Sequence, residues 1–194
     1  MTKISELLAM AVGPAVAVLD GIDDDGLDAP TPCAEYDVRA LISHLFQVVV
    51  NFQALAARQE VDFGTTPDIV TGDWRARFGE EAAGLVAAWA VPGADEGTTG
   101  AMGLPARTVG NMVLGDLTVH AWDLARATGQ EFAPDRSVLD EIGPALAAMA
   151  PMAREAKVFG EPYPVPDGAS PFDEVLALTG RDPGWRPPGA SGVS

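Results

Sequence analysis

The stretch GDLTVHAWDLARATG, residues 115–129, decides how the fold of this chain is interpreted. Its apolar residues recur at the spacing of an amphipathic helix, and Gly129 stands where a helix commonly ends. Asp116 and His120 are four residues apart, so they share one face of that helix. Leucines occupy the same face, which predicts that the carboxylate and the imidazole are both turned toward the interior.

The other histidine of the chain repeats this pattern. A helix is expected to start at Asp37, whose side chain is a good N-cap. His44 lies between Leu41 and Val48 on the apolar stripe of that helix. The protein has only two histidines, and both therefore fall on inward stripes of different long helices.

Helical periodicity extends over most of the chain, and no alternating β pattern of any length is present. We expect an all-α fold: a four-helix bundle with additional short helices and an irregular C-terminal extension. The pattern predicts a first helix over residues 4–22, a second from Asp37, a third from Trp74 to Trp89, a fourth from about Arg107 to Thr128, a fifth from Pro134 and a short one at about 171–178.

Proline and glycine separate these elements. Pro14 is expected to kink or split the first helix. The acidic segment 23–36 is predicted to be a loop, and segment 91–107 is too rich in glycine and proline for a helix, so a short hairpin or an irregular crossover is expected there. Residues 1–185 are expected to form a single domain and residues 186–194 a disordered tail.

The charge balance argues against two classes of partner. The 194-residue chain has 12 Lys and Arg against 28 Asp and Glu, a formal net charge of −16, and no basic run. Nucleic-acid binding requires clustered basic side chains that neutralise phosphates. Anionic membranes attract the same clusters. We therefore expect neither nucleic acid nor a membrane surface as a partner.

Apolar runs and cysteine content point to a protein of the cytoplasm. The longest apolar runs are broken by Gly, Pro or charge before bilayer length, so no transmembrane helix is expected. The N-terminal residues have helical periodicity and an early acid, which favours a first helix over a signal peptide. The single cysteine, Cys33, excludes an internal disulfide and fits a reducing compartment, and we expect it to pack in the core.

His44, Asp116 and His120 are the candidate metal ligands. Burying an ionised aspartate costs several kcal/mol unless it is paired or bound to a metal. Two imidazole nitrogens and one carboxylate oxygen form a three-ligand set with one open position, as in catalytic zinc sites. Nickel, cobalt or iron would also accept these ligands.

A simpler interpretation stays open at this point. A histidine on an apolar stripe is commonly a core residue satisfied by a hydrogen bond. Asp116 and His120 could form a plain ion pair between positions i and i+4. The spacing alone does not decide between these two interpretations and a metal site.

Several other residues are weaker candidates. Arg39, Arg107 and Asn111 lie on or near the helices that carry the candidate ligands and could bind a substrate carboxylate, although solvated side chains are the simpler expectation. Asp123 is expected to lie at the surface or to orient a ligand histidine. Cys33 is a minor candidate for approaching the site.

Two segments together resemble a known family. TPCAEYDVRALISHL, followed far downstream by GDLTVHAWDLARATGQ, resembles the DinB-like metal-binding bundles of actinobacteria, which are similar to the N-terminal domain of mycothiol-dependent maleylpyruvate isomerase. The resemblance reaches from the first helix to about Trp185. It implies a four-helix bundle that binds a divalent metal through His44, Asp116 and His120. The isomerase has glutamate where this chain has Asp116, and it has a second domain for which this chain has no room.

The resemblance favours a thiol-dependent metalloenzyme, with zinc as the expected metal and mycothiol as the implied cosubstrate. In this hypothesis a metal-bound thiolate attacks a small electrophilic molecule. A hydrolase that uses metal-bound water is an alternative. A bundle that binds metal or forms a homodimer without catalysis is another.

Overall fold

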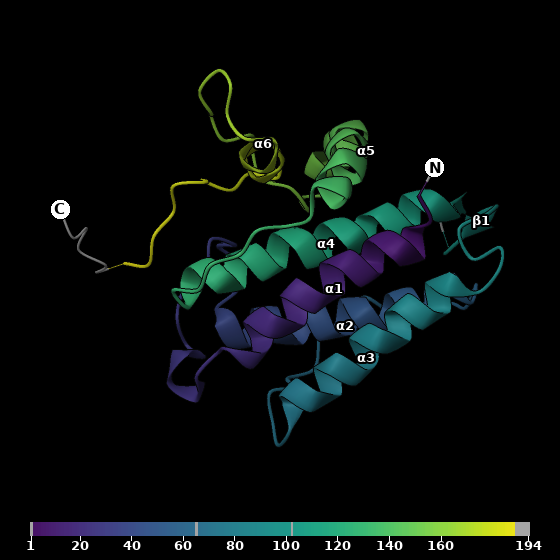
Figure 1. Ribbon diagram of the computed structural model, residues 1–194, viewed down its shortest axis with the longest axis horizontal. Helices are drawn as coiled ribbons and strands as arrows, with labels where there is room; N and C mark the ends of the chain where they lie inside the picture. Colours follow the sequence, from purple (N-terminus) through teal and green to yellow (C-terminus); the bar gives the residue numbers. More distant parts are fainter. Residues whose placement is uncertain (1, 65, 102, 189–194) are drawn as a thin grey trace.

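The computed structural model describes residues 2–64, 66–101 and 103–188, and it is an all-α fold, as predicted (Figure 1). Only one two-stranded antiparallel sheet interrupts the helices in this part of the chain. The elements are α1 (Ile4–Asp20), a short 3-10 helix (Asp24–Gly26), α2 (Val38–Ala56), α3 (Trp74–Ala90), β1 (Thr98–Thr99), β2 (Leu104–Pro105), α4 (Ala106–Ala127), α5 (Arg136–Glu155) and α6 (Pro171–Leu178).

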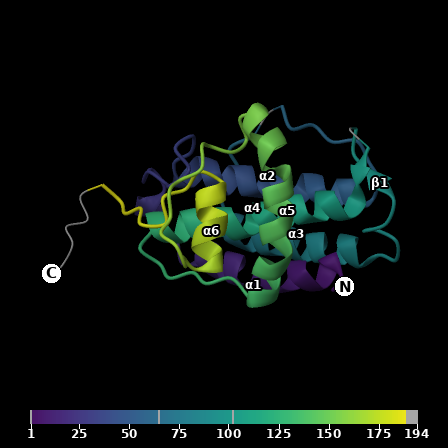
Figure 2. The same cartoon turned by 90° about the horizontal axis from the view of Figure 1, so that it is seen from above.

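Helices α1 to α4 form a four-helix bundle. Both α1 and α2 pack against α3 and against α4, so α1 contacts two helices that do not directly follow it in the sequence, whereas α2 and α3 are neighbours in both. Helices α5 and α6 pack against each other, and α5 also packs against α4. They lie on the outer side of α4, away from α3 (Figure 1), and seen from above α5 crosses over α4 (Figure 2). Helix α4 is therefore enclosed from both sides.

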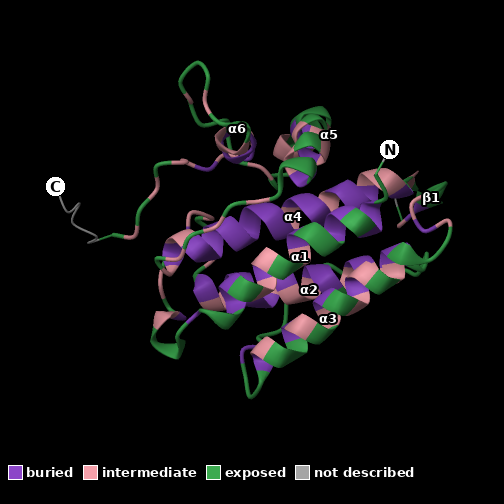
Figure 3. Cartoon of the chain, viewed as in Figure 1, coloured by how far each residue is buried: buried purple, intermediate pink, exposed green. Residues whose placement is uncertain are grey.

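This position explains the burial of α4. The three other bundle helices alternate buried and exposed residues, whereas α4 is buried along most of its length (Figure 3). Small residues make the close packing possible: a side chain added at Gly110 would meet Ile4 of α1, and one added at Gly115 would meet Leu146 of α5. The helix that carries Asp116 and His120 is thus closely packed against both α1 and α5.

Local signals set the helix ends as expected. The Asp37 side chain accepts a hydrogen bond of 2.8 Å from the backbone N–H of Ala40 and caps α2. Gly129, at φ +70°, follows the last turn of α4. Pro14 does not split the first helix, contrary to one of the two expectations, because α1 runs unbroken through it. For segment 91–107 the sequence predicts a short hairpin or an irregular crossover. The pairing of β1 with β2 confirms the hairpin.

One helix among the described residues meets the length and composition of a membrane span. In the described part of the chain, α2 is long and apolar enough to cross a membrane by length and composition. Half of that window is buried inside the protein, and α2 packs against α3 and α4. A helix in the core of a bundle is also long and apolar, and the burial and contacts of α2 are those of such a helix.

The C-terminal extension is irregular apart from α6. It folds back over the bundle, and the segments on both sides of α6 reach the end of α5 and the C-terminal half of α4. Residues 189–194 of the expected disordered tail lie outside the described residues. That residues 1–185 form one domain stays a prediction.

Candidate metal centre

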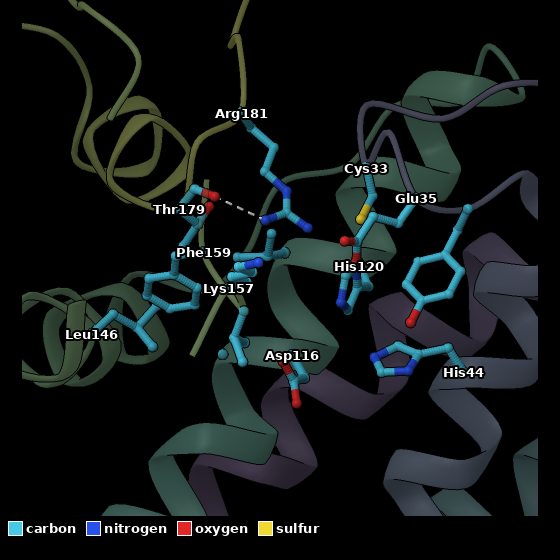
Figure 4. Close-up of a pocket in the computed structure, with 14 residues that line it drawn as sticks. Cys33, Glu35, His44, Asp116, His120, Leu146, Lys157, Phe159, Thr179 and Arg181 are labelled. Atoms are coloured by element: carbon cyan, nitrogen blue, oxygen red, sulfur yellow. Dashed lines mark hydrogen bonds between the residues drawn. The ribbon is translucent and has the colours of Figure 1, made fainter. Parts of the chain in front are cut away.

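A pocket opens between α2, α4 and the C-terminal extension (Figure 4). Its volume is about 240 Å³. Helices α2 and α4 form one side, and the loop before α2 and the segments that flank α6 form the other. The pocket therefore lies on the outer side of the four-helix bundle, beneath the extension, and not in the bundle core.

All three predicted ligands line this pocket. His44 comes from α2, while Asp116 and His120 come from successive turns of α4. The two imidazole rings meet edge to face with their centroids 5.1 Å apart. Tyr36 stacks on the other face of His44 at 5.0 Å and an interplanar angle of 19°, which limits rotation of the His44 ring.

Asp116 has no hydrogen-bond donor among the residues that the structure describes, although its carboxylate faces two groups of positive character. Burial raises the pKa of Asp116, while His120 and Arg181 lower it in part. A carboxylate that burial destabilises, and that no described donor satisfies, is suited to accept a cation.

His120 is held by a chain of polar contacts. Its Nδ1 atom lies 2.9 Å from Oδ2 of Asp123, and an Arg181 guanidinium N–H donates to the same oxygen at 3.1 Å. Since an ionised carboxylate can only accept, Nδ1 carries a proton that it donates to Asp123, and Nε2 is the nitrogen left for another partner. Asp123 is fully buried, so the expectation of a surface position is wrong. Its hydrogen bond to His120 matches the other expectation, in which it orients a histidine.

His44 is neutral at physiological pH. Burial, together with the charges of His120 and Arg181, lowers the pKa of His44 to about 4. A neutral imidazole has the free lone pair that a metal ligand requires. His44 thus presents a nitrogen in the correct state for coordination.

Cys33 lies at the pocket and not in the core, which corrects the expectation for this residue. Ligand atoms of Cys33, His120 and Asp123 lie within 4.8 Å of one another, and in the described part of the chain no other group of His, Cys, Asp and Glu, including His44, Asp116 and His120, is this close together. The set with Cys33 is nevertheless the weaker one because Asp123 already binds Arg181, whose positive charge would repel a cation there. Burial also raises the pKa of the Cys33 thiol, which keeps it protonated in the absence of a metal.

The three other candidates lie outside the pocket. Arg39 pairs with Asp68 at 3.5 Å. Arg107 and Asn111 both donate to Glu141, at 2.8 and 3.1 Å. Arg107 and Asn111 therefore link α4 to α5. Their side chains are engaged in this contact, so they are neither freely solvated nor part of the pocket.

Sequence reasoning missed the cationic part of the pocket. Arg181 is buried and Lys157 is exposed, and both line the pocket from segments far from the two histidines in sequence. No local pattern marks either residue. Tyr36 could have been found, since it directly precedes the N-cap of α2 within the segment that carries the family resemblance.

Comparisons with known proteins identify the family of the chain. A family model described as "Mycothiol maleylpyruvate isomerase N-terminal domain" matches residues 11–125. Two proteins of Mycobacterium tuberculosis, the "Uncharacterized protein MT0763" of strain CDC 1551 / Oshkosh and the "Uncharacterized protein Rv0738" of strain H37Rv, are each 31% identical over 175 residues. The match covers 85% of this chain and 90% of each relative. No solved structure matches the chain.

Proposed function

The chain belongs to the mycothiol maleylpyruvate isomerase N-terminal domain family, a DinB-like family, and from this premise we propose that it is a zinc-dependent enzyme that joins a low-molecular-weight thiol to a small electrophile. His44, Asp116 and His120 would hold the metal. The observation that supports this proposal is that all three residues, from two helices, line one pocket, with His44 neutral and the His120 ring oriented by Asp123.

The donor set suits a divalent ion of the zinc type. Two imidazole nitrogens and one carboxylate oxygen are typical of catalytic zinc sites, in which a further position stays open. Asp123 and Arg181 lie behind His120 in the arrangement by which a carboxylate commonly orients a ligand histidine. A bound cation would offset the cost of burying the ionised Asp116 carboxylate, which has no hydrogen-bond donor among the described residues.

The metal, when bound, would supply the positive charge that keeps a thiol deprotonated at neutral pH. Arg181 and Lys157 give the rim of the pocket two further positive charges, which suit an anionic group on the thiol or on the electrophile. Tyr36 fixes the His44 ring by stacking. In the proposed addition the S–H bond would break, the sulfur would bond to one atom of a polarised carbon double bond, and the displaced π electron pair would take up a proton on the product.

Mycothiol is the thiol that the family name suggests, and we propose it as the cosubstrate. A cytoplasmic location fits a reduced thiol cosubstrate and the single free cysteine. The strongly acidic composition supports small molecules over nucleic acids as partners. A homodimer is a further proposal, which the molecular mass in solution would test.

Calorimetric titration of metal-free protein with zinc tests the binding step. We expect one site per chain in the wild type and in Val50→Ala, an exposed position on the same helix as His44. His44→Ala should lose this site. Equal zinc binding by wild type and His44→Ala would overturn the ligand assignment.

Turnover of the zinc-loaded protein tests the chemistry. Consumption of mycothiol against a panel of electrophiles should be lost with His44→Ala and kept with Val50→Ala. Hydrolysis of esters or amides without any thiol would favour the metal-water hydrolase. Zinc binding without turnover of either kind would favour a metal-binding bundle without catalysis, and it would overturn the proposed activity.

A further inference from the structure

A second hollow continues the pocket along α4. It lies between α4 and α5 and also has a volume of about 240 Å³. The two share a boundary, which is formed by Asp116, Leu146, Val158 and Phe159. In Figure 4, Leu146 and Phe159 lie on one side of Asp116 and His44 lies on the other. The candidate ligands therefore stand at one end of a longer cleft.

The two ends of this cleft differ in chemistry. The end beneath the extension carries the charged and polar side chains of the site, including Arg181 and Lys157. In the groove between α4 and α5, Asp116 at the shared boundary is the only charged residue among the described ones that line it. The rest of its lining is apolar: Leu104, Met112, Leu146, Met149, Met152, Ala153, Ala156, Val158 and Phe159.

Two of these apolar side chains are exposed to an extent that needs an explanation. Met152 is 45% exposed and Val158 is 66% exposed. Both line the groove, where an apolar ligand would remove them from water. Three of the lining residues are methionines, whose flexible side chains adapt to ligands of different shape.

We infer that this groove binds an extended apolar substituent of the electrophilic substrate, an alkyl or aryl group, while the reacting end of that molecule reaches Asp116 and the two histidines. The inference rests on the proposed function, since it concerns the substrate of the same site. An acidic substrate without such a substituent, small enough for the polar end alone, would leave Met152 and Val158 uncovered.

The test uses n-alkyl hydroxamic acids, whose head group binds zinc and whose alkyl tail can be lengthened. Zinc-loaded protein with ¹³C-methyl methionine is titrated with acetohydroxamic acid and its longer homologues. We expect about threefold tighter binding for each added methylene until the groove is filled. The methyl signals of Met112, Met149 and Met152 should shift, whereas that of Met10 on α1 should not.

A pair of double variants sharpens the test without changing charge. Met152→Gln with Val158→Ser makes two exposed groove positions polar, and Met10→Gln with Val50→Ser does the same at exposed positions outside it. The first variant should bind the long hydroxamates about tenfold more weakly and acetohydroxamic acid unchanged. The second should bind every homologue as the wild type does.

The outcomes separate this inference from the metal proposal. If acetohydroxamic acid binds but longer tails bring no gain, the inference about the groove is wrong and the metal proposal stands. If the protein takes up no zinc, the metal proposal fails, and n-alkanols then test the groove in metal-free protein. Shifts confined to the three groove methionines would support the groove in that case, and their absence would overturn it.

Discussion

His120 and Asp123, one turn apart on α4, are joined by a hydrogen bond of 2.9 Å between Nδ1 and Oδ2, and Arg181 binds the same carboxylate oxygen. This contact fixes the imidazole ring and leaves Nε2 as the nitrogen that can accept a ligand. The C-terminal extension, which supplies Arg181, thus takes part in orienting a residue in the middle of the bundle. The proposed metal site is therefore a property of the whole fold and not of α4 alone.

Asp123→Asn tests this orienting contact. An amide keeps the shape of the side chain but removes the charge that holds both the imidazole N–H and Arg181. We expect zinc affinity to fall 10- to 100-fold, as measured by competition with a chelating dye. Asp140→Asn, an exposed acid on α5 paired with Arg136, is the matched control and should bind zinc normally. Unchanged affinity of Asp123→Asn would show that the contact does not orient the ligand.

Asp116→Asn should have opposite effects on the metal-free and the zinc-loaded protein. Burial raises the folded-state pKa of Asp116 above its unfolded value, so its stabilising contribution is lost as the pH rises through the folded pKa. At neutral pH the ionised carboxylate then destabilises the metal-free fold, and the amide should raise the free energy of unfolding by about 1 kcal/mol. Zinc should stabilise only the wild type. Denaturant titrations with and without zinc measure both effects, and a less stable metal-free Asp116→Asn would contradict the account.

The lowered pKa of His44 predicts that its contribution to the free energy of unfolding changes with pH in the direction opposite to that of Asp116. Its pKa is lowered from 6.5 to about 4 in the folded protein, so the unfolded chain binds more protons between these two values. The contribution of His44 is fully present above pH 6.5 and is lost as the pH falls toward 4. As the pH falls over this range, the free energy of unfolding of the metal-free wild type should decrease by up to about 3 kcal/mol more than that of His44→Gln. Equal slopes in urea titrations at several pH values would show that His44 is not buried as a neutral ring.

Cys33 should react slowly in spite of its place in the pocket. Burial raises the pKa of the thiol, which lowers the thiolate fraction and hence the rate of alkylation. Iodoacetamide at mildly alkaline pH should label the folded metal-free protein more slowly than the same chain in concentrated guanidinium chloride. Mass spectrometry follows both reactions. Labelling at least as fast in the folded protein would indicate an activated thiolate, and it would favour Cys33 as a participant in the chemistry.

The sequence predicts the helices well because their signals are local. The stripes of α1 to α5, the cap at Asp37 and the glycine after α4 all act within a few residues of one another. His44 and His120 could be paired from the sequence because buried histidines are few and both lie on helical stripes. Of the two expectations for Pro14, a split helix is wrong because α1 continues unbroken through this residue, and a kink stays a prediction.

The remainder of the pocket depends on contacts distant in sequence. Arg181 reaches Asp123 across 58 positions, and no periodicity connects the two. Cys33 belongs to a loop that is held by local hydrogen bonds with Thr31 and Tyr36, but the C-terminal extension that completes the pocket beside it is distant in sequence. Asp123 was within reach of sequence reasoning, since residues three apart are neighbours on a helix, but the partner that buries it was not.

X-ray absorption at the zinc edge of the zinc-loaded protein, recorded without added thiol, tests the central claim most directly. The account predicts only nitrogen and oxygen neighbours at about 2.0–2.2 Å, with the multiple scattering of two imidazoles from His44 and His120. A sulfur neighbour at about 2.3 Å would contradict it, since that result would place the metal on Cys33 instead.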